Sequence, residues 1–169
     1  KAVLELNRLL SDDEEDVGIE VSATHIRFRL GDSIFTSKLI DGRFPDYERV
    51  IPPKGGVQVR ADRDTLRQSL TRASILSNEK YRGIRFQLSG GMLHLIANNP
   101  EQEEAEEELE VEYAGDNMTI GFNVGYLLDV LGVIDSKTVL FSITDANSSC
   151  LVENDPPDAG RYVIMPMRL

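Results

Sequence analysis

Hydrophobic and polar positions along this chain follow a pattern that repeats. The first ten residues carry apolar side chains at helical spacing, namely Val3, Leu6, Leu9 and Leu10. Three short segments with strand character follow between residues 17 and 41, and in the middle one Ile26, Phe28 and Leu30 alternate with polar residues. Spacings of three and four indicate a helix, whereas strict alternation indicates a half-buried strand. The pattern predicts a helix followed by three strands.

The same order returns after an additional strand at residues 57–61. Asp62 is placed to cap a helix, because its side chain can accept hydrogen bonds from the first turn. The apolar stripe of this helix consists of Leu66, Leu70 and Ala73. Three strands are expected next, over residues 83–89, 91–98 and 106–114. The Gly90-Gly91 pair between the first two is typical of a hairpin turn.

A third copy begins with a strand at residues 118–122. Asn123 is expected to cap the following helix, whose stripe consists of Leu127, Leu131 and Ile134. The last three strands are expected over residues 138–144, 149–154 and 161–169. The unit is therefore strand, helix and three strands, with a period of about fifty residues.

Two such units are expected to form one α+β domain, with two antiparallel sheets outside and two helices together on one side. The first copy lacks its opening strand, and the chain begins at Lys1 without an initiator methionine, so we expect a fragment. The Pro- and Gly-containing stretch "DGRFPDYERVIPPKGG" predicts a junction. We predict a truncated domain over residues 1–52 and a complete domain over residues 53–169.

Composition favours a protein of the cytoplasm. No apolar run approaches the roughly 20 residues of a membrane helix, and no signal peptide is recognisable. The single cysteine, Cys150, fits a reducing compartment and is expected to be a buried strand residue.

Charge is distributed very unevenly. The net charge is −11, and this value by itself argues against nucleic-acid binding. Seven glutamates lie within residues 101–110. The predicted helices nevertheless carry basic residues, namely Lys1, Arg8, Arg67 and Arg72. These residues form either ordinary solvated helix faces or a surface that touches phosphates without reading bases.

The sequence gives no support for catalysis, a cofactor or a metal. The only histidines, His25 and His94, lie far apart in the sequence, and no phosphate-binding glycine loop is present. Two apolar features lack an obvious core role. Ile75 lies off the stripe of its helix beside Leu76, which indicates either a subunit contact or a helix-end contact. The chain also ends in the apolar segment "VIMPMRL", although chain ends are usually polar.

Several segments together resemble the bacterial beta sliding clamp family, the beta subunit of DNA polymerase III. They are "IFTSKLIDGRFPDYERVIP", "ILSNEKYRGIRF", "IANNPEQEEAEEELEVEYAG", "IGFNVGYLLDVL" and "YVIMPMRL". In that family three such domains form a protomer, and two protomers close a ring around duplex DNA. The resemblance implies the latter part of the second domain plus the third domain of a non-enzymatic processivity factor.

The resemblance also implies three surfaces. A groove for short linear motifs of polymerases and clamp-loader subunits would comprise Pro45, Arg49, Val50, Asn123, Tyr126, Ser149, Val163, Ile164, Met165, Pro166, Met167, Arg168 and Leu169. The ring interface of the homodimer would comprise Ile75, Leu76, Glu101, Glu103, Glu104, Glu106 and Glu107. The lining that faces duplex DNA would comprise Lys1, Arg8, Arg67 and Arg72.

Two other classes of function stay open from the residues alone. One is a protein-interaction module of the same fold without a DNA role, which failure to hold circular DNA would support. The other is an enzyme that uses the acidic cluster, which metal-dependent turnover would support.

Overall fold

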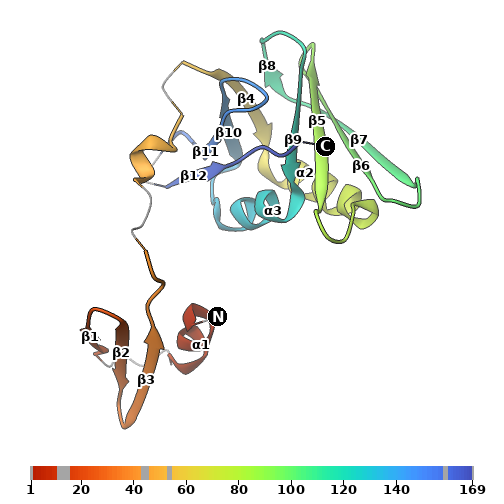
Figure 1. The fold of residues 1–169 in the computed structure, drawn as a ribbon. Coiled ribbons are helices and arrows are strands. Elements are labelled where there is room, and N and C mark those ends of the chain that lie inside the picture. Colours follow the sequence, from red (N-terminus) through yellow and green to blue (C-terminus); the bar gives the residue numbers. More distant parts are fainter. Residues whose placement is uncertain (1, 11–15, 43–45, 53–54, 158–159, 169) are drawn as a thin grey trace. The chain divides into compact units, whose positions relative to one another are not determined.

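The chain folds as two units, Lys1–Pro45 and Asp46–Leu169, which Figure 1 shows in sequence colours. The computed structural model describes residues 2–10, 16–42, 46–52, 55–157 and 160–168. The boundary between the units lies before the predicted domain division after Pro52, and the linker that follows it contains the short 3-10 helix η1 (Tyr47–Arg49).

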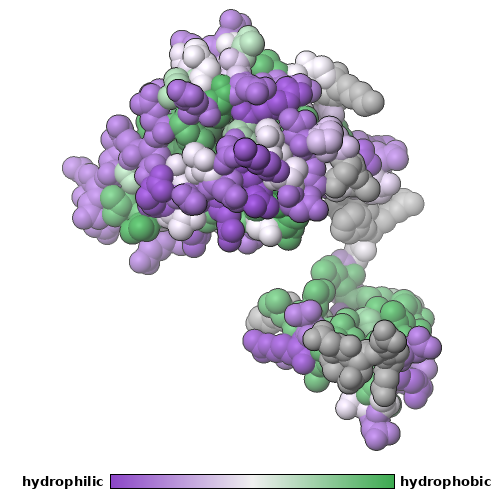
Figure 2. Space-filling model, turned by 180° about the vertical axis from the view of Figure 1, so that it is seen from behind, coloured by the Kyte–Doolittle hydropathy of each residue, from purple (hydrophilic) through white to green (hydrophobic). Residues whose placement is uncertain are grey.

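The smaller unit has the predicted order of one helix and three strands. These are α1 (Ala2–Leu9), β1 (Gly18–Val21), β2 (His25–Leu30) and β3 (Ser33–Lys38), and the strands form an antiparallel sheet in the order β1-β2-β3. The rings of Phe28 and Phe35 stack across the sheet at 6.1 Å. None of its described residues is buried, and Figure 2 shows hydrophobic side chains gathered on its surface. Its described part therefore lacks a closed core.

The larger unit contains two antiparallel sheets and two helices. The sheet orders are β12-β11-β10-β4-β8 and β7-β6-β5-β9. The strands of the first sheet are β4 (Val57–Asp62), β8 (Glu112–Tyr113), β10 (Thr138–Ile143), β11 (Cys150–Asp155) and β12 (Arg161–Ile164). Those of the second are β5 (Gly83–Ser89), β6 (Met92–Asn98), β7 (Glu104–Glu110) and β9 (Met118–Asn123). The helices are α2 (Arg63–Ala73), its 3-10 extension η2 (Ser74–Leu76) and α3 (Val124–Val133).

Both helices lie side by side along one side of the two sheets, as Figure 1 shows. The predicted stripe of α2 is completely buried, with Leu66, Leu70 and Ala73 each 0% exposed. The ring of Phe86 contacts those of Phe122 and Phe141 at centroid distances of 5.2 and 6.3 Å, so one core joins both sheets. The predicted α+β class is confirmed. None of the helices in the described segments is long and apolar enough to cross a membrane.

The predicted hairpin at the glycine pair is present, because Gly90 and Gly91 adopt φ angles of +57° and +82° between β5 and β6. The single strand predicted over residues 106–114 is wrong. The chain leaves β7 at Glu110, passes buried Val111, and enters β8 in the other sheet. The Val111 N–H donates to the Gly91 carbonyl at 2.9 Å, and this bond holds the switch between sheets.

The final predicted strand is shorter than expected. It ends at Ile164, and the residues after it are not a strand. Ile164 pairs with Cys150 of β11, and both side chains are buried. Burial raises the pKa of the Cys150 thiol to about 12, so Cys150 is the buried strand residue that the sequence predicts.

Candidate functional site

The apolar end of the chain forms a tail, residues 165–168, after β12, in which Met165 and Arg168 are exposed and Pro166 and Met167 are half-buried. Met165 is 60% exposed, although a methionine of the core would be buried. The tail is held against the second sheet by the Met167 N–H, which donates to the Gly121 carbonyl of β9 at 2.8 Å. Ile164, just before the tail, is only 4% exposed and packs in the core. Met165 to Arg168 are therefore the part of this segment that a partner can reach.

Asn123 joins the beginning of α3 to a neighbouring loop. Its Oδ1 accepts from the Gly125 and Tyr126 N–H groups at 2.8 and 3.3 Å, as expected of a helix cap. Its Nδ2 donates to the Tyr81 carbonyl at 3.1 Å. Tyr81 and Tyr126 are 54% and 61% exposed, so the hydrogen bonds of Asn123 hold the backbone beside two exposed aromatic rings.

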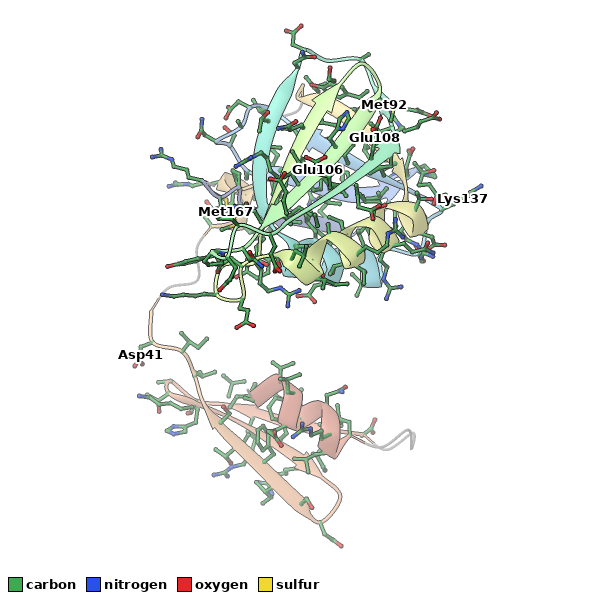
Figure 3. The ribbon with its side chains drawn as sticks, turned by 90° about the vertical axis from the view of Figure 1, so that its right-hand side faces the viewer. Asp41, Met92, Glu106, Glu108, Lys137 and Met167 are labelled. Atoms are coloured by element: carbon green, nitrogen blue, oxygen red, sulfur yellow. The ribbon has the colours of Figure 1, made fainter. Side chains whose placement is uncertain are left out.

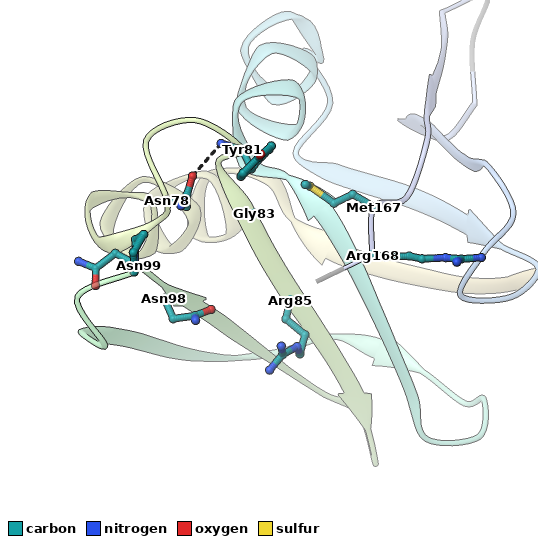
Figure 4. A pocket seen from close by; sticks show the side chains of 9 residues that line it. Asn78, Tyr81, Gly83, Arg85, Asn98, Asn99, Met167 and Arg168 are labelled. Atoms are coloured by element: carbon teal, nitrogen blue, oxygen red, sulfur yellow. Dashed lines mark hydrogen bonds between the residues drawn. The ribbon is translucent and has the colours of Figure 1, made fainter.

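Tyr81 is a candidate site residue that the sequence argument missed. It lines the same hollow as Met167 (Figure 4), although 86 positions separate the two residues in the chain. The available signal was an aromatic residue within the polar loop "SNEKYR", because exposed tyrosines are enriched where proteins bind partners. The structure thus adds a second aromatic residue beside the predicted groove set.

The linker also reaches this region. The Ser149 hydroxyl donates to the Val50 carbonyl at 2.8 Å, and Val50 itself is 42% exposed. Ser149 precedes Cys150, whose partner in β12 is Ile164, so the register puts Ser149 beside the start of the tail. Arg49 is ion-paired with Asp46 at 3.2 Å. Val163 is half-buried in β12. The predicted groove residues Pro45 and Leu169 lie outside the described residues.

A second candidate surface is the open edge of the four-stranded sheet. In the described part of the chain β7 pairs with β6 alone. Glu104, Glu106 and Glu108 are exposed on one side of β7, and Figure 3 shows Glu106 and Glu108 on the same sheet surface. Ile75 in η2 is 77% exposed. Ile75, Leu76, Glu101 and Glu103 line one hollow, so an apolar centre lies beside an acidic edge.

Glu107 differs from its neighbours on β7. Its side chain faces α2 and forms a double hydrogen bond with Arg72, at 2.6 Å for both nitrogen–oxygen pairs. These bonds hold the pKa of Glu107 below its ordinary value and raise that of Arg72. The sequence assigned the two residues to different surfaces, ring interface and DNA lining. The structure joins them into one ion pair, which neutralises part of the basic charge on α2.

Among the described residues of the predicted DNA lining, Arg67 is the one without an ion pair. It is exposed on α2, and no ion pair among the described residues involves it. Arg8 on α1 is ion-paired with Glu5 at 2.9 Å, and Lys1 lies outside the described residues. Across the described ranges, no group of three or more His, Cys, Asp or Glu side chains is arranged to hold a metal ion.

Family models match nearly the whole chain. The central-domain model of the DNA polymerase III beta subunit matches residues 1–46, and the C-terminal-domain model of the same subunit matches residues 48–168. The beta sliding clamp of Pseudomonas aeruginosa is 59% identical over 169 residues, which cover 100% of this chain and 46% of that protein. The Escherichia coli clamp is 48% identical with the same coverage.

Solved structures agree with the sequence matches. A crystal structure of the Pseudomonas aeruginosa beta subunit gives a TM-score of 0.85 at 58% identity, over 99% of this chain and 46% of that chain. A Bartonella birtlesii sliding clamp bound to griselimycin gives 0.85 at 40% identity, also over 99% and 46%. This chain spans about half the length of the relatives it matches.

Proposed function

We propose, because this chain belongs to the DNA polymerase III beta subunit family of bacterial sliding clamps, that its full-length protein is a processivity factor. It encircles duplex DNA and performs no chemistry itself, and it keeps a polymerase at the template by topology. The observation that carries the proposal is the 59% identity to a beta sliding clamp over the whole chain. A protein with this role acts in the bacterial cytoplasm, at the nucleoid.

We further propose the domain assignment within this chain. Residues 1–52 are the latter part of the central domain, and residues 53–169 are the C-terminal domain. The family-model matches support this order, since they change from the central to the C-terminal domain between residues 46 and 48. The exposed apolar side chains of the smaller unit also support it, because a complete domain buries such residues.

The tail surface is the proposed docking groove for short linear motifs of polymerases and clamp-loader subunits. Met165 and Met167 suit this role, because methionine is flexible and polarizable, and one surface of this kind accepts several partners. The exposed rings of Tyr81 and Tyr126 supply the rigid aromatic area that is typical of peptide-binding hot spots. The acidic edge with Ile75 and Leu76 is the proposed ring interface.

Encirclement predicts that the topology of the DNA decides retention. The full-length protein, loaded by its clamp loader onto nicked circular plasmid, is expected to survive a high-salt gel-filtration wash and to leave when the plasmid is cut once. Phosphate contacts alone do not survive such salt. Equal retention on linear and circular plasmid would contradict encirclement, and no retention on either would favour a clamp-fold interaction module without a DNA role.

Arg67 and Arg72 are expected to contribute differently to contact with DNA. Binding of this chain to linear duplex should be weak, independent of base sequence and strongly salt-dependent, because only phosphates are contacted. Arg67→Gln should reduce the slope of log K against log salt by about 0.9. Arg72→Gln should reduce it less, because Glu107 already pairs with Arg72. Fluorescence anisotropy across a salt series measures both slopes, and equal slopes for the two variants would contradict this assignment.

A further inference from the structure

The hollow beside the tail extends beyond the proposed groove. It has a volume of about 440 Å³ and lies between the loop that carries Tyr81, the strands β5 and β6, and the tail (Figure 4). Met167 and Arg168 of the groove set also line this hollow. A peptide bound against the tail can therefore extend directly into this hollow, which adjoins the groove.

The two ends of the hollow differ in chemistry. Tyr81 and Met167 form an apolar end, as Figure 4 shows. Away from them the lining includes Arg85 and the side-chain amides of Asn98 and Asn99, together with Pro100. None of the described residues that line the hollow is acidic, although the chain has a net charge of −11. As far as the structure describes it, the end with Arg85 is thus a region without carboxylates in an acidic molecule.

The walls of the hollow are held in place by hydrogen bonds. Asn78 Oδ1 accepts from the Lys80 and Tyr81 N–H groups, both at 2.9 Å. The Tyr81 carbonyl is held in turn by Asn123. On the other side, Asn99 bonds Glu103 twice, at 2.7 and 2.9 Å. A preformed wall lowers the entropy cost of binding a peptide.

Of the described residues that line the hollow, Arg85 and Arg168 are the two cations. Arg85 lies in β5 opposite Ile96 and Gly121, and no ion pair among the described residues involves it. The side chain of Arg168 extends away from Arg85 in Figure 4. The strand carboxylate in register with Arg85 is that of Glu106, which is opposite Ile96 on β7, two strands away. Neither Glu106 nor Glu104 is part of the lining, so the described part of the hollow holds no carboxylate beside Arg85.

We propose that this hollow receives the residue that flanks the apolar anchor of a bound peptide, and that Arg85 selects a carboxylate side chain at that position. The inference rests on the proposed docking groove, with which the hollow shares Met167. Guanidinium and carboxylate form charge-assisted, often bidentate hydrogen bonds. The side-chain amide of Asn98, which also lines the hollow, has both a donor and an acceptor for the main chain of an extended peptide.

The test uses the full-length protein and a fluorescein-labelled clamp-binding peptide from the replicative polymerase of the same organism. Each position next to the apolar anchor is made either glutamate or glutamine. At one position the glutamate peptide should bind native protein about fivefold more tightly at low salt, the size expected of a partly exposed charge-assisted bond. Arg85→Gln should reduce this ratio to about one and leave the glutamine peptide unaffected.

A matched control removes a positive charge elsewhere. Lys137→Gln makes the same charge change on the opposite side of the larger unit from Met167, as Figure 3 shows, and should keep the fivefold ratio. Arg85→Lys should keep part of it. A ratio of one in native protein, or the native ratio in Arg85→Gln, would overturn the inference. Failure of both peptides to bind native protein would instead overturn the docking groove, and this inference with it.

Discussion

Ile75→Glu in the full-length protein is expected to raise the dissociation constant of the dimer by at least about 100-fold. Ile75 is 77% exposed here and borders a hollow that Glu101 and Glu103 also line. Loss of its apolar contact removes roughly 2 kcal/mol, as at a typical hot spot. A carboxylate buried among other carboxylates adds a further penalty. Sedimentation equilibrium over a dilution series measures the constant.

Val133→Glu is the matched control for this change. Val133 is also apolar and exposed, at 62%, but lies on α3 away from the acidic edge. It should leave the dimer constant unchanged. Neither variant removes a buried side chain, so both should melt near the native temperature. A native dimer constant in Ile75→Glu would show that the ring closes through another surface.

Met165→Ala, or deletion of residues 167–169, is expected to weaken binding of clamp-binding peptides by about 30-fold or more. Truncation of a hot-spot residue costs roughly 2 kcal/mol, and each 1.4 kcal/mol is about tenfold in affinity. The fold should survive, because Met165 is 60% exposed and the buried residue of this segment, Ile164, is kept in both variants. The deletion removes the Met167–Gly121 bond, which ties only the tail to β9. Fluorescence anisotropy of the full-length variants measures the affinities.

Thermal melting of the same variants separates docking from stability. Met92→Ala supplies a methionine control on β6, well away from the tail (Figure 3), and should bind peptide with native affinity. If the tail variants melt early while their folded fraction binds peptide normally, the tail is part of the core. That outcome would remove the docking groove from the proposed function.

Local patterns predicted the elements well where one face is buried. The cap at Asp62 and the stripe of Leu66, Leu70 and Ala73 appear in α2 as expected, because capping and amphipathic spacing act within a few residues. The strand predicted over residues 83–89 is likewise confirmed as β5, in which Ile84, Phe86 and Leu88 are buried. These features need no knowledge of the distant chain.

Features that depend on long-range pairing were not predictable in this way. The switch at Val111 from one sheet to the other depends on the carbonyl of Gly91, which lies in another hairpin. The pairing of Arg72 with Glu107 joins a helix to an edge strand 35 positions away. Tyr81 and Met167 line one hollow because β9 contacts both segments. It pairs with β5, which follows the loop of Tyr81, and it also holds the tail. The groove and the ring interface themselves were implied by the family resemblance, not by spacing.

The exposed glutamates of β7 constrain the symmetry of any assembly that uses this edge. An open strand edge is a template for pairing with any other strand, including its own copy. Two β7 edges placed against each other would set Glu104, Glu106 and Glu108 of one copy against those of the other, and like charges in such positions are destabilising. The edge therefore resists both fibrous self-association and a self-complementary contact. Used as the proposed ring interface, this edge requires a different surface as its partner, and such a head-to-tail contact is the kind that builds closed rings.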